Sequence, residues 1–238
     1  MEYHRFLQQS FNSIINYLLP QNCFLCGHLS DLVLCECCLQ SLPYLQHHCQ
    51  RCGKELSTKD NICGACLVKL PLYKQVRAIF KYEYPVDKLI HAAKFEKNLA
   101  ILDYLGKEMS KQLSIQLSTK CDLPDVLIPV PLHPQRLRER GYNQSVELAR
   151  IIAKQMHITL NYTVCQRIRN TPQQTILPSK QRRRNLHGAF VANNIPQHWQ
   201  RVVLIDDVMT TGSTVEELTR VLLQAGVSHV DVWCCARR

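Results

Sequence analysis

Two adjacent carboxylates, Asp206 and Asp207, follow a short apolar run and precede a segment of hydroxyl side chains around one glycine. The run, residues 202–205, is too apolar for a surface strand and too short for a buried helix, which predicts a central parallel strand. We expect a helix to follow, with Ser213 or Thr214 at its N-cap. Such a helix N-terminus after a glycine-containing loop favours anions, because its N–H groups are free and its dipole is positive there. The carboxylates would repel a bare phosphate, so the expected ligand carries a phosphate together with a sugar diol or a metal ion.

This combination resembles the signature of the type I phosphoribosyltransferases, which use phosphoribosyl pyrophosphate (PRPP). The resemblance implies that Asp206 and Asp207 hold the ribose hydroxyls. It also implies that the 5′-phosphate is bound by Thr210, Thr211, Gly212, Ser213 and Thr214. Thr210 stands where the 6-oxopurine members commonly carry an aspartate that serves the purine ring, which disfavours that substrate class. The alternative is an ordinary strand, polar turn and helix.

A second candidate ligand segment, residues 128–144, places three arginines just beyond another buried apolar strand. They are Arg136, Arg138 and Arg140. A guanidinium suits pyrophosphate because its planar fork donates two hydrogen bonds to one phosphate. We expect Arg136 and Arg140 to contact PRPP and Arg140 to take part in catalysis, while Asn143 or Gln144 caps the next helix or touches the ligand. The alternative is a solvated charged turn.

A polar and basic segment, residues 167–187, is predicted to be a long mobile loop. Its candidate ligand residues are Arg167, Arg169, Thr171, Gln174, Lys180, Arg182, Arg183, Arg184 and Asn185. Phosphoribosyl transfer builds negative charge on the departing pyrophosphate, which Mg²⁺ and positioned cations such as Arg182 stabilise while a closed loop excludes water. The alternatives are a nucleic-acid contact and a plain solvated loop, since a Lys/Arg cluster neutralises the phosphates of any polymer.

The cysteines indicate metal binding. The chain has 13 of them and no sign of export, which argues against a disulfide framework. Four C-x2-C pairs are present: Cys23/Cys26, Cys35/Cys38, Cys49/Cys52 and Cys63/Cys66. Two such pairs complete one tetrahedral zinc site, so sequential pairing predicts two zinc ions. Interleaved pairing and an iron–sulfur cluster are the alternatives.

The expected role of the zinc is structural. Four thiolates leave no open coordination position for catalysis. The segment has too few large apolar residues to fold by burial alone, whereas structural zinc contributes about 10–16 kcal/mol in small zinc peptides. Cys37 is spare, and the small core residues are predicted to include Cys121, Cys165, Cys234 and Cys235.

The amino-acid composition indicates the class of binding partner but does not identify one partner. The 238 residues carry a formal net charge of +10, which favours polyanions such as PRPP or nucleic acid. No apolar run approaches the length of a membrane span. Residues 1–19 lack the continuous apolar core of a signal peptide. They are predicted to form an amphipathic helix that docks on the protein, with a membrane surface as the alternative.

Strand and helix patterns alternate after the cysteine-rich region. Strands are expected at residues 76–82, 126–130, 159–165, 188–191, 202–205 and 229–234, and helices at residues 85–95, 100–117, 144–156 and 216–223. This order predicts an α/β fold of the type I phosphoribosyltransferase kind, with a parallel-rich sheet, helices on both faces and the ligand at the carboxyl ends of the strands. We expect an N-terminal helix at residues 1–20, a small double zinc ribbon domain at 21–70 and the phosphoribosyltransferase-like domain at 75–238.

The combined motifs resemble the ComF family from about Cys23 to the C-terminus. They are the four C-x2-C pairs, Lys94-Phe95, Pro129-Val130-Pro131, Arg140-Gly141-Tyr142-Asn143-Gln144, Thr171-x2-Gln174, Arg182-x2-Asn185-x2-Gly188-Ala189-Phe190 and the Asp206–Thr214 signature. The family consists of bacterial phosphoribosyltransferase-like proteins with a double zinc ribbon, associated with natural competence. The resemblance implies a cytoplasmic protein that acts after DNA uptake, with a helicase and single-stranded DNA as partners.

The favoured hypothesis is therefore a Mg²⁺-dependent, PRPP-binding phosphoribosyltransferase (a glycosyltransferase) in competence, with an unidentified acceptor. Since the chain stops soon after the last expected strand, we expect the zinc region or the N-terminal helix to supply the cover over the acceptor site. One alternative is a non-catalytic, zinc-stabilised accessory protein that binds single-stranded DNA. Another is a structural adaptor for competence proteins.

Overall fold

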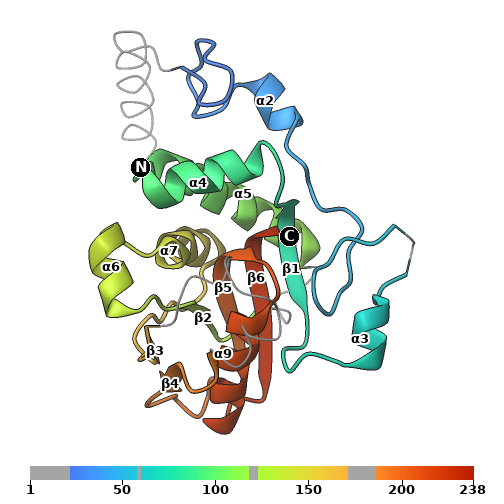
Figure 1. Ribbon diagram of the computed structural model, residues 1–238, viewed down its shortest axis with the longest axis vertical. Coiled ribbons are helices and arrows are strands. Elements are labelled where there is room, and N and C mark those ends of the chain that lie inside the picture. The colour runs from blue at the N-terminus through green and yellow to red at the C-terminus, as the bar shows by residue number, and fades with distance from the viewer. Residues whose placement is uncertain (1–21, 58–59, 118–122, 171–185) are drawn as a thin grey trace. The chain divides into compact units, whose positions relative to one another are not determined.

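The structure is a computed structural model that describes residues 22–57, 60–117, 123–170 and 186–238 (Figure 1). It divides the chain into two compact units, Met1–Leu42 and Pro43–Arg238. The first cysteine tetrad lies in the smaller unit, together with helix α2 (Glu36–Gln40). The second tetrad lies in the larger unit, with the α/β elements. The expected N-terminal helix at residues 1–20 falls outside the described residues.

The larger unit is built on a four-stranded parallel sheet with the strand order β1-β6-β5-β2. Its strands are β1 (Val76–Lys81), β2 (Val126–Pro129), β5 (Arg201–Met209) and β6 (His229–Arg237). The predicted central strand is confirmed, because β5 pairs with β2 on one side and β6 on the other. Since all four strands are parallel, their carboxyl ends lie along one edge, where α/β folds bind ligands.

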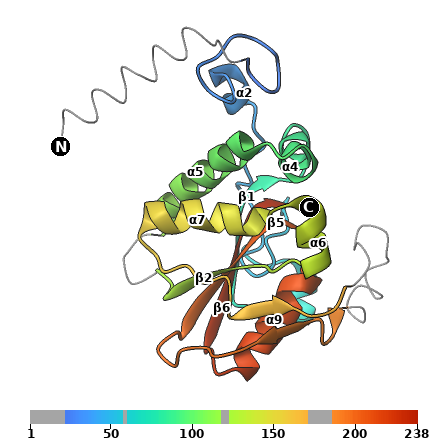
Figure 2. The ribbon, with the colours of Figure 1, turned by 90° about the vertical axis from the view of Figure 1, so that its left-hand side faces the viewer.

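Helices cover both faces of this sheet. On one face α5 (Leu99–Gln116) contacts β1 and β6, and α7 (Gln144–Met156) contacts β5 and β2; Figure 2 shows these two helices side by side. On the other face α9 (Ser213–Gln224) contacts β6, and its buried residues share one core cluster with Val202 and Leu204 of β5. Helix α4 (Val86–Phe95) follows the carboxyl end of β1 and packs on α5. The predicted parallel sheet with helices on both faces is confirmed.

Two local predictions differ from the structure. The strand expected at residues 159–165 is reduced to an isolated parallel bridge between Leu160 and Leu127. The Asn161 side chain ends the pairing, because it accepts hydrogen bonds from the Thr163 and Val164 N–H groups in a tight turn. Strand β3 (Cys165–Arg167) then pairs antiparallel with β4 (Phe190–Ala192).

The second difference concerns the arginine segment, where no helix was predicted and a short helix is found. Helix α6 (Pro134–Arg140) has the His133 side chain at its N-cap and proline at its first position. Gly141 ends it with φ 84°, a left-handed conformation that glycine adopts without strain.

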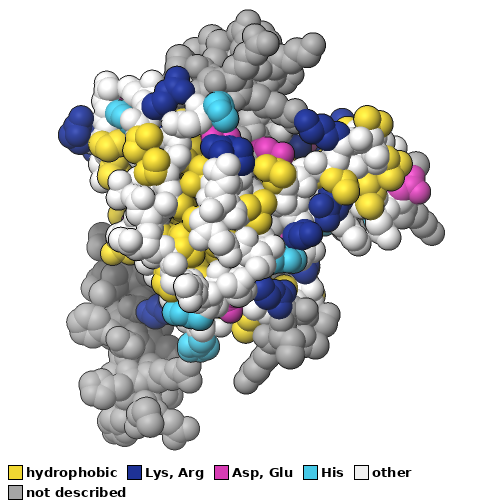
Figure 3. All heavy atoms as spheres, turned by 90° about the horizontal axis from the view of Figure 1, so that it is seen from below, with side chains coloured by type: hydrophobic (Ala, Val, Ile, Leu, Met, Phe, Trp, Pro, Cys, Tyr) yellow, Lys and Arg dark blue, Asp and Glu magenta, His cyan; other side chains and the backbone are white. Residues whose placement is uncertain are grey.

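The second cysteine-rich segment is attached to the edge of the sheet at β1. The Lys81 N–H donates to the Pro43 carbonyl at 2.8 Å, and the Leu45 N–H donates to the Ile79 carbonyl at 2.8 Å. The segment ends in the short helix α3 (Gly64–Val68), where Leu67 and Val68 are exposed. Figure 3 shows hydrophobic side chains gathered on this cysteine-rich segment among Lys and Arg side chains. Among the described residues, no helix has the length and apolar character needed to cross a membrane.

Candidate functional site

The two carboxylates lie near the carboxyl end of β5, both partly buried. Asp206 Oδ1 accepts hydrogen bonds from the Asp207 N–H at 3.0 Å and from the Ser145 hydroxyl at 3.3 Å. Asp207 Oδ1 accepts from the Val208 N–H at 2.6 Å. Because Ser145 stands in the first turn of α7, this helix fixes the orientation of Asp206.

A lysine from α4 neutralises one of these carboxylates. Lys94 Nζ lies 2.9 Å from Asp207 Oδ2, and the side chains are 20% and 14% exposed, respectively. Burial alone would lower the pKa of Lys94, but Asp207 and, less strongly, Asp206 raise it above its usual value. The ion pair therefore persists at neutral pH and joins α4 to the end of β5.

Asp206 has an unusual affinity for a proton. Burial is the main cause that raises its pKa from 3.8 to about 7, and the neighbouring charge of Asp207 adds to it. Lys94, the Asp207 N–H and the Ser145 hydroxyl act in the opposite direction without reversing the shift. A substantial fraction of Asp206 therefore keeps its proton close to neutral pH.

The hydroxyl segment forms a tight loop between β5 and α9. Gly212, with φ 77°, is the N-cap of α9, so the helix begins at Ser213, and the predicted N-cap at Ser213 or Thr214 is wrong by one or two residues. The Thr211 and Ser213 hydroxyls are 2.9 Å apart. Both hydroxyls therefore lie beside the first N–H groups of a twelve-residue helix, an arrangement that suits a phosphate.

The arginines of α6 differ in their environment. Arg138 is exposed, whereas Arg136 and Arg140 are partly buried. Arg140 donates to the Gln144 side-chain oxygen at 3.1 Å and lies over the Phe95 ring, 5.6 Å from its centroid. Burial and the nearby Arg140 lower the pKa of Arg136. The structure thus brings Arg136 and Arg140 together at the end of α6.

Arg167 was expected in the mobile loop, but the structure places it at the end of β3. It is buried, lies over the Phe190 ring and lines a cavity of about 520 Å³ with Pro131 and Asn143. Burial and then Arg136 lower the pKa of Arg167 to about 10, while Asp206 opposes the shift. The Arg167 guanidinium is therefore close enough to interact electrostatically with both Arg136 and Asp206.

Of the remaining loop candidates, only Arg169 lies within the described residues. Arg169 is exposed and donates to the His187 carbonyl. Outside the described residues lie Thr171, Gln174, Lys180, Arg182, Arg183, Arg184 and Asn185. Of the helix-cap candidates, Asn143 is confirmed, because its side chain accepts from the Ser145 N–H at 3.1 Å.

The second cysteine segment contacts the hydroxyl loop directly. Arg237 Nε donates to the Cys52 carbonyl at 2.8 Å, while its Nη1 donates to the Met209 carbonyl at 3.1 Å and to the Thr210 carbonyl. A Cβ atom added to Gly212 would lie 3.0 Å from the Tyr73 hydroxyl oxygen. A cleft of about 240 Å³ separates the two parts, lined by Lys54, Lys69, Thr211, Ser213 and others. One guanidinium therefore bridges a cysteine knuckle and the loop backbone.

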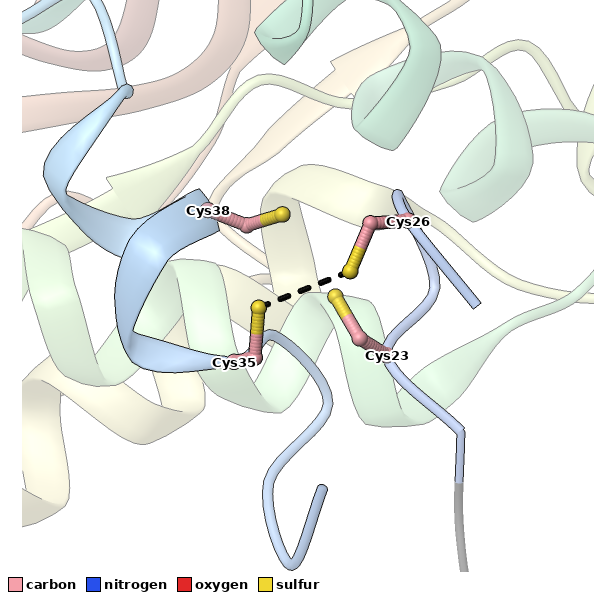
Figure 4. A group of neighbouring side chains, drawn as sticks. All are labelled: Cys23, Cys26, Cys35 and Cys38. Carbon is pink, nitrogen blue, oxygen red and sulfur yellow. Dashed lines mark hydrogen bonds between the residues drawn. The ribbon is translucent and has the colours of Figure 1, made fainter. Parts of the chain in front are cut away.

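The cysteine thiols form two tetrads with sequential pairing. They are Cys23, Cys26, Cys35 and Cys38 in the smaller unit, and Cys49, Cys52, Cys63 and Cys66 in the larger. Within each tetrad all sulfur atoms lie within 4.8 Å of one another, and Figure 4 shows the first four pointing toward one centre. The Cys26–Cys35 and Cys52–Cys63 sulfur distances are 3.5 and 3.7 Å. Zinc–sulfur bonds of about 2.3 Å in a tetrahedron give sulfur separations of roughly 3.8 Å, so both tetrads are compatible with structural zinc.

Backbone N–H groups favour the thiolate form of one cysteine in each tetrad. The Gly27 N–H donates to the Cys23 carbonyl and the Gly53 N–H to the Cys49 carbonyl, closing matching knuckles. Burial raises the pKa of Cys23 and Cys49, but backbone N–H groups aimed at the sulfur atoms outweigh it and lower the values to about 6 and about 7. The predicted core role holds for Cys165, Cys234 and Cys235, which are buried, while Cys37 is exposed and Cys121 lies outside the described residues.

Comparison with known proteins decides the family. The double zinc ribbon domain matches residues 14–67 and the phosphoribosyl transferase domain matches residues 143–238. The DNA utilization protein YhgH of Escherichia coli O157:H7 is 33% identical over 92% of this chain and 98% of that protein. Competence protein F of Haemophilus influenzae is 34% identical over 88% of this chain and 93% of that protein. The chain belongs to the ComF family.

This membership confirms the expected phosphoribosyltransferase-like fold with a double zinc ribbon. Among solved structures, the glutamine PRPP amidotransferase from B. subtilis complexed with ADP and GMP aligns with a TM-score of 0.36 and 20% identity. The alignment covers 56% of this ComF chain and 26% of that one.

Several residues at the site of this ComF protein were not predicted individually. Lys94 entered the sequence argument only within a motif. Ser145, Tyr73 and Arg237 gave no signal, because their contacts join segments far apart in the chain.

Proposed function

We propose that this ComF protein binds PRPP and acts as a phosphoribosyltransferase-like protein in natural competence and the use of imported DNA. The observation that carries the proposal is the placement of Asp206 and Asp207 in the last part of β5, directly before the hydroxyl loop at the N-terminus of α9. A ribose 5-phosphate group needs both features, diol acceptors and a phosphate cradle. The names of the relatives support the biological setting.

In the proposed complex, Asp206 and Asp207 accept hydrogen bonds from the ribose hydroxyls, and the loop of residues 210–214 holds the 5′-phosphate. Arg136, Arg140 and Arg167 give the neighbouring surface a positive charge that suits pyrophosphate. The 5′-phosphate and the pyrophosphate are thereby held at the two ends of one ribose, with the diol between them.

In a transfer reaction, the acceptor nucleophile forms a bond to ribose C1 while the bond from C1 to pyrophosphate breaks. The electron pair of that bond leaves with pyrophosphate, and the acceptor releases its proton. Arginines stabilise the negative charge that builds on pyrophosphate, which is where preorganised cations accelerate a reaction. Arg182, which lies outside the described residues, is our further candidate for this role.

Mg²⁺ fits the site as a partner of PRPP rather than as a resident ion. Carboxylate oxygens are its preferred ligands, but Lys94 already neutralises Asp207 at 2.9 Å. Mg²⁺ typically keeps several waters and binds through substrate phosphates with one or two carboxylates. When bound, it would neutralise pyrophosphate charge, and Asp206 is the carboxylate here that could hold it.

The test is calorimetric titration of PRPP with Mg²⁺ into the full chain and into an Asp206→Asn/Asp207→Asn variant. We expect wild-type binding and at least a tenfold loss in the variant, because each lost charged hydrogen bond costs about 1.5–3 kcal/mol. Asp103→Asn is the control, since Asp103 is an exposed partner of Lys107 on α5. The absence of wild-type binding would refute the proposal, and pyrophosphate release with candidate acceptors would establish turnover.

The alternative function is a non-catalytic accessory protein that binds single-stranded DNA. The net charge of +10 and the DNA-related names of relatives favour it. Phosphate contacts release counterions, so this function requires an affinity that falls steeply with salt. A flat salt dependence, or unchanged binding after neutralising Arg182, Arg183 and Arg184, would count against it.

A further inference from the structure

Two aromatic rings are exposed at the end of α4. Phe95 is 56% exposed, and the His91 side chain one turn earlier is 62% exposed. Their ring centroids are 4.7 Å apart with an angle of 43° between the planes. The Arg140 guanidinium lies over the Phe95 ring at 5.6 Å. Two rings and a planar cation thus form one small surface that water still reaches.

This surface lies at the end of the helix that also supplies a contact to the proposed ribose site. Lys94, which precedes Phe95, lies 2.9 Å from Asp207. Tyr142, which follows Arg140 by two residues, donates its hydroxyl to the Ala93 carbonyl of the same helix end. The end of α4 is therefore held on one side by β5 and on the other by the connection between α6 and α7. The rings project from the same turn of helix that contacts the diol carboxylates.

We propose that Phe95, flanked by His91 and Arg140, is the platform on which the heterocyclic ring of the phosphoribosyl acceptor stacks. The proposal rests on the PRPP site above and assigns its missing acceptor subsite. It also places that subsite on α4 of the α/β domain, instead of on the zinc region or the N-terminal helix as the sequence suggested.

The ligand class follows from the chemistry of the three side chains. A phenyl face attracts a flat ring, and a guanidinium can stack on such a ring or donate two hydrogen bonds to its carbonyl or carboxylate oxygens. A base attached to ribose C1 is next to the hydroxyl groups that Asp206 and Asp207 would hold. The acceptor is therefore expected to be a nitrogen heterocycle with oxygen substituents. Its ring nitrogen forms the bond to C1 as pyrophosphate leaves with the electron pair, and the ring loses a proton.

The test compares ligands that differ only in the ring. Ribose 5-phosphate and then AMP, GMP, CMP and UMP are titrated into the full chain by calorimetry. At least one nucleotide should bind more tightly than ribose 5-phosphate. Phe95→Ala should remove that advantage, a loss of about tenfold on the basis of measured base–aromatic stacking, while the affinity for ribose 5-phosphate stays within twofold.

Matched variants distinguish a loss of aromatic stacking from a loss of apolar volume or a general effect on the fold. Phe95→Trp should keep the nucleotide advantage, and Phe95→Leu should lose it although the apolar volume is largely retained. Ile115→Ala removes another exposed apolar side chain, 69% exposed on α5, and should change nothing.

Three results would overturn the proposal. One is equal affinity of the wild-type protein for all nucleotides and ribose 5-phosphate. Another is a nucleotide advantage that survives Phe95→Ala. Both leave the PRPP site intact, whereas failure of ribose 5-phosphate and PRPP themselves to bind would refute the proposed function and this inference together.

Discussion

At the scale of single residues, the two neighbouring aspartates of the site have different interaction partners. Asp207 has a lysine partner, and Asp206 has hydrogen bonds from Ser145 and a backbone N–H. A carboxylate without an ion pair in a partly buried position binds a proton more readily. Binding of a ribose diol or a cation would therefore change the protonation of Asp206.

This difference predicts a pH dependence of stability. The pKa of Asp206 is about 7 in the folded chain and 3.8 as its usual value. At pH values between these two pKa values, Asp206 keeps a proton in the folded state that it releases in the unfolded state. The free energy of unfolding therefore falls as the pH rises toward 7. Asp206→Asn removes this contribution. Between pH 5 and pH 8, the free energy of unfolding measured with urea should fall by roughly 1–2 kcal/mol more in the wild type than in the variant. The full pKa shift would give a larger value, but water reaches part of the Asp206 side chain.

The control for this measurement is Asp103→Asn, whose stability difference from wild type should stay constant over the same range because Asp103 is exposed. If the difference for Asp206→Asn were also constant, Asp206 would be ionised as in water and the site would carry two full negative charges.

At the scale of elements, the loop between β5 and α9 depends on one glycine. Gly212 has φ 77°, and a Cβ atom there would lie 2.7 Å from Met209 Cε and 3.0 Å from the Tyr73 hydroxyl. Substitution therefore adds a steric conflict to backbone strain. The conflict would be relieved by moving either the loop or the Tyr73 segment.

Gly212→Ala is expected to lower the affinity for ribose 5-phosphate by at least about tenfold, because displaced N–H groups lose hydrogen bonds to a charged phosphate. Gly226→Ala is the matched control: Gly226 also has a positive φ, 98°, but no atom lies within 4 Å of its added Cβ. Both variants should lose about 1 kcal/mol of stability through strain, and Gly212→Ala should lose more because of its steric conflict. Equal ligand affinity of the two, measured by calorimetry, would show that loop geometry at Gly212 does not matter.

The elements also show what sequence can reveal. Helix α7 was predicted at its observed bounds, because its apolar periodicity is strong and depends on local residues. The central strand was predicted at residues 202–205, but β5 extends to Met209 and includes both aspartates. Helix α6 was not predicted, since charged residues dominate it and its stability comes from Pro134 and the Gly141 end. The carboxylates and cysteine tetrads are visible as motifs, but the contact of Lys94 with Asp207 spans distant segments and needed the fold.

At the scale of the whole chain, the two cysteine tetrads have different surroundings. The second belongs to the unit Pro43–Arg238, and its Cys52 carbonyl accepts a hydrogen bond from Arg237, which also donates to Met209. Metal at this tetrad should therefore stabilise the hydroxyl loop as well as the ribbon, since zinc binding in small ribbons is coupled to folding.

Cys52→Ser is expected to lower the zinc content and to weaken ribose 5-phosphate binding about fivefold or more, because the Arg237 bridge loses its ordered acceptor at Cys52. Cys26→Ser is the matched variant, since Cys26 has the same position in the first knuckle but lies in the unit Met1–Leu42. It should lower the zinc content equally and leave the affinity within twofold. Elemental analysis gives the zinc content and calorimetry gives the affinity. If both variants bound ribose 5-phosphate as wild type does, the second ribbon would support its own fold without positioning the loop.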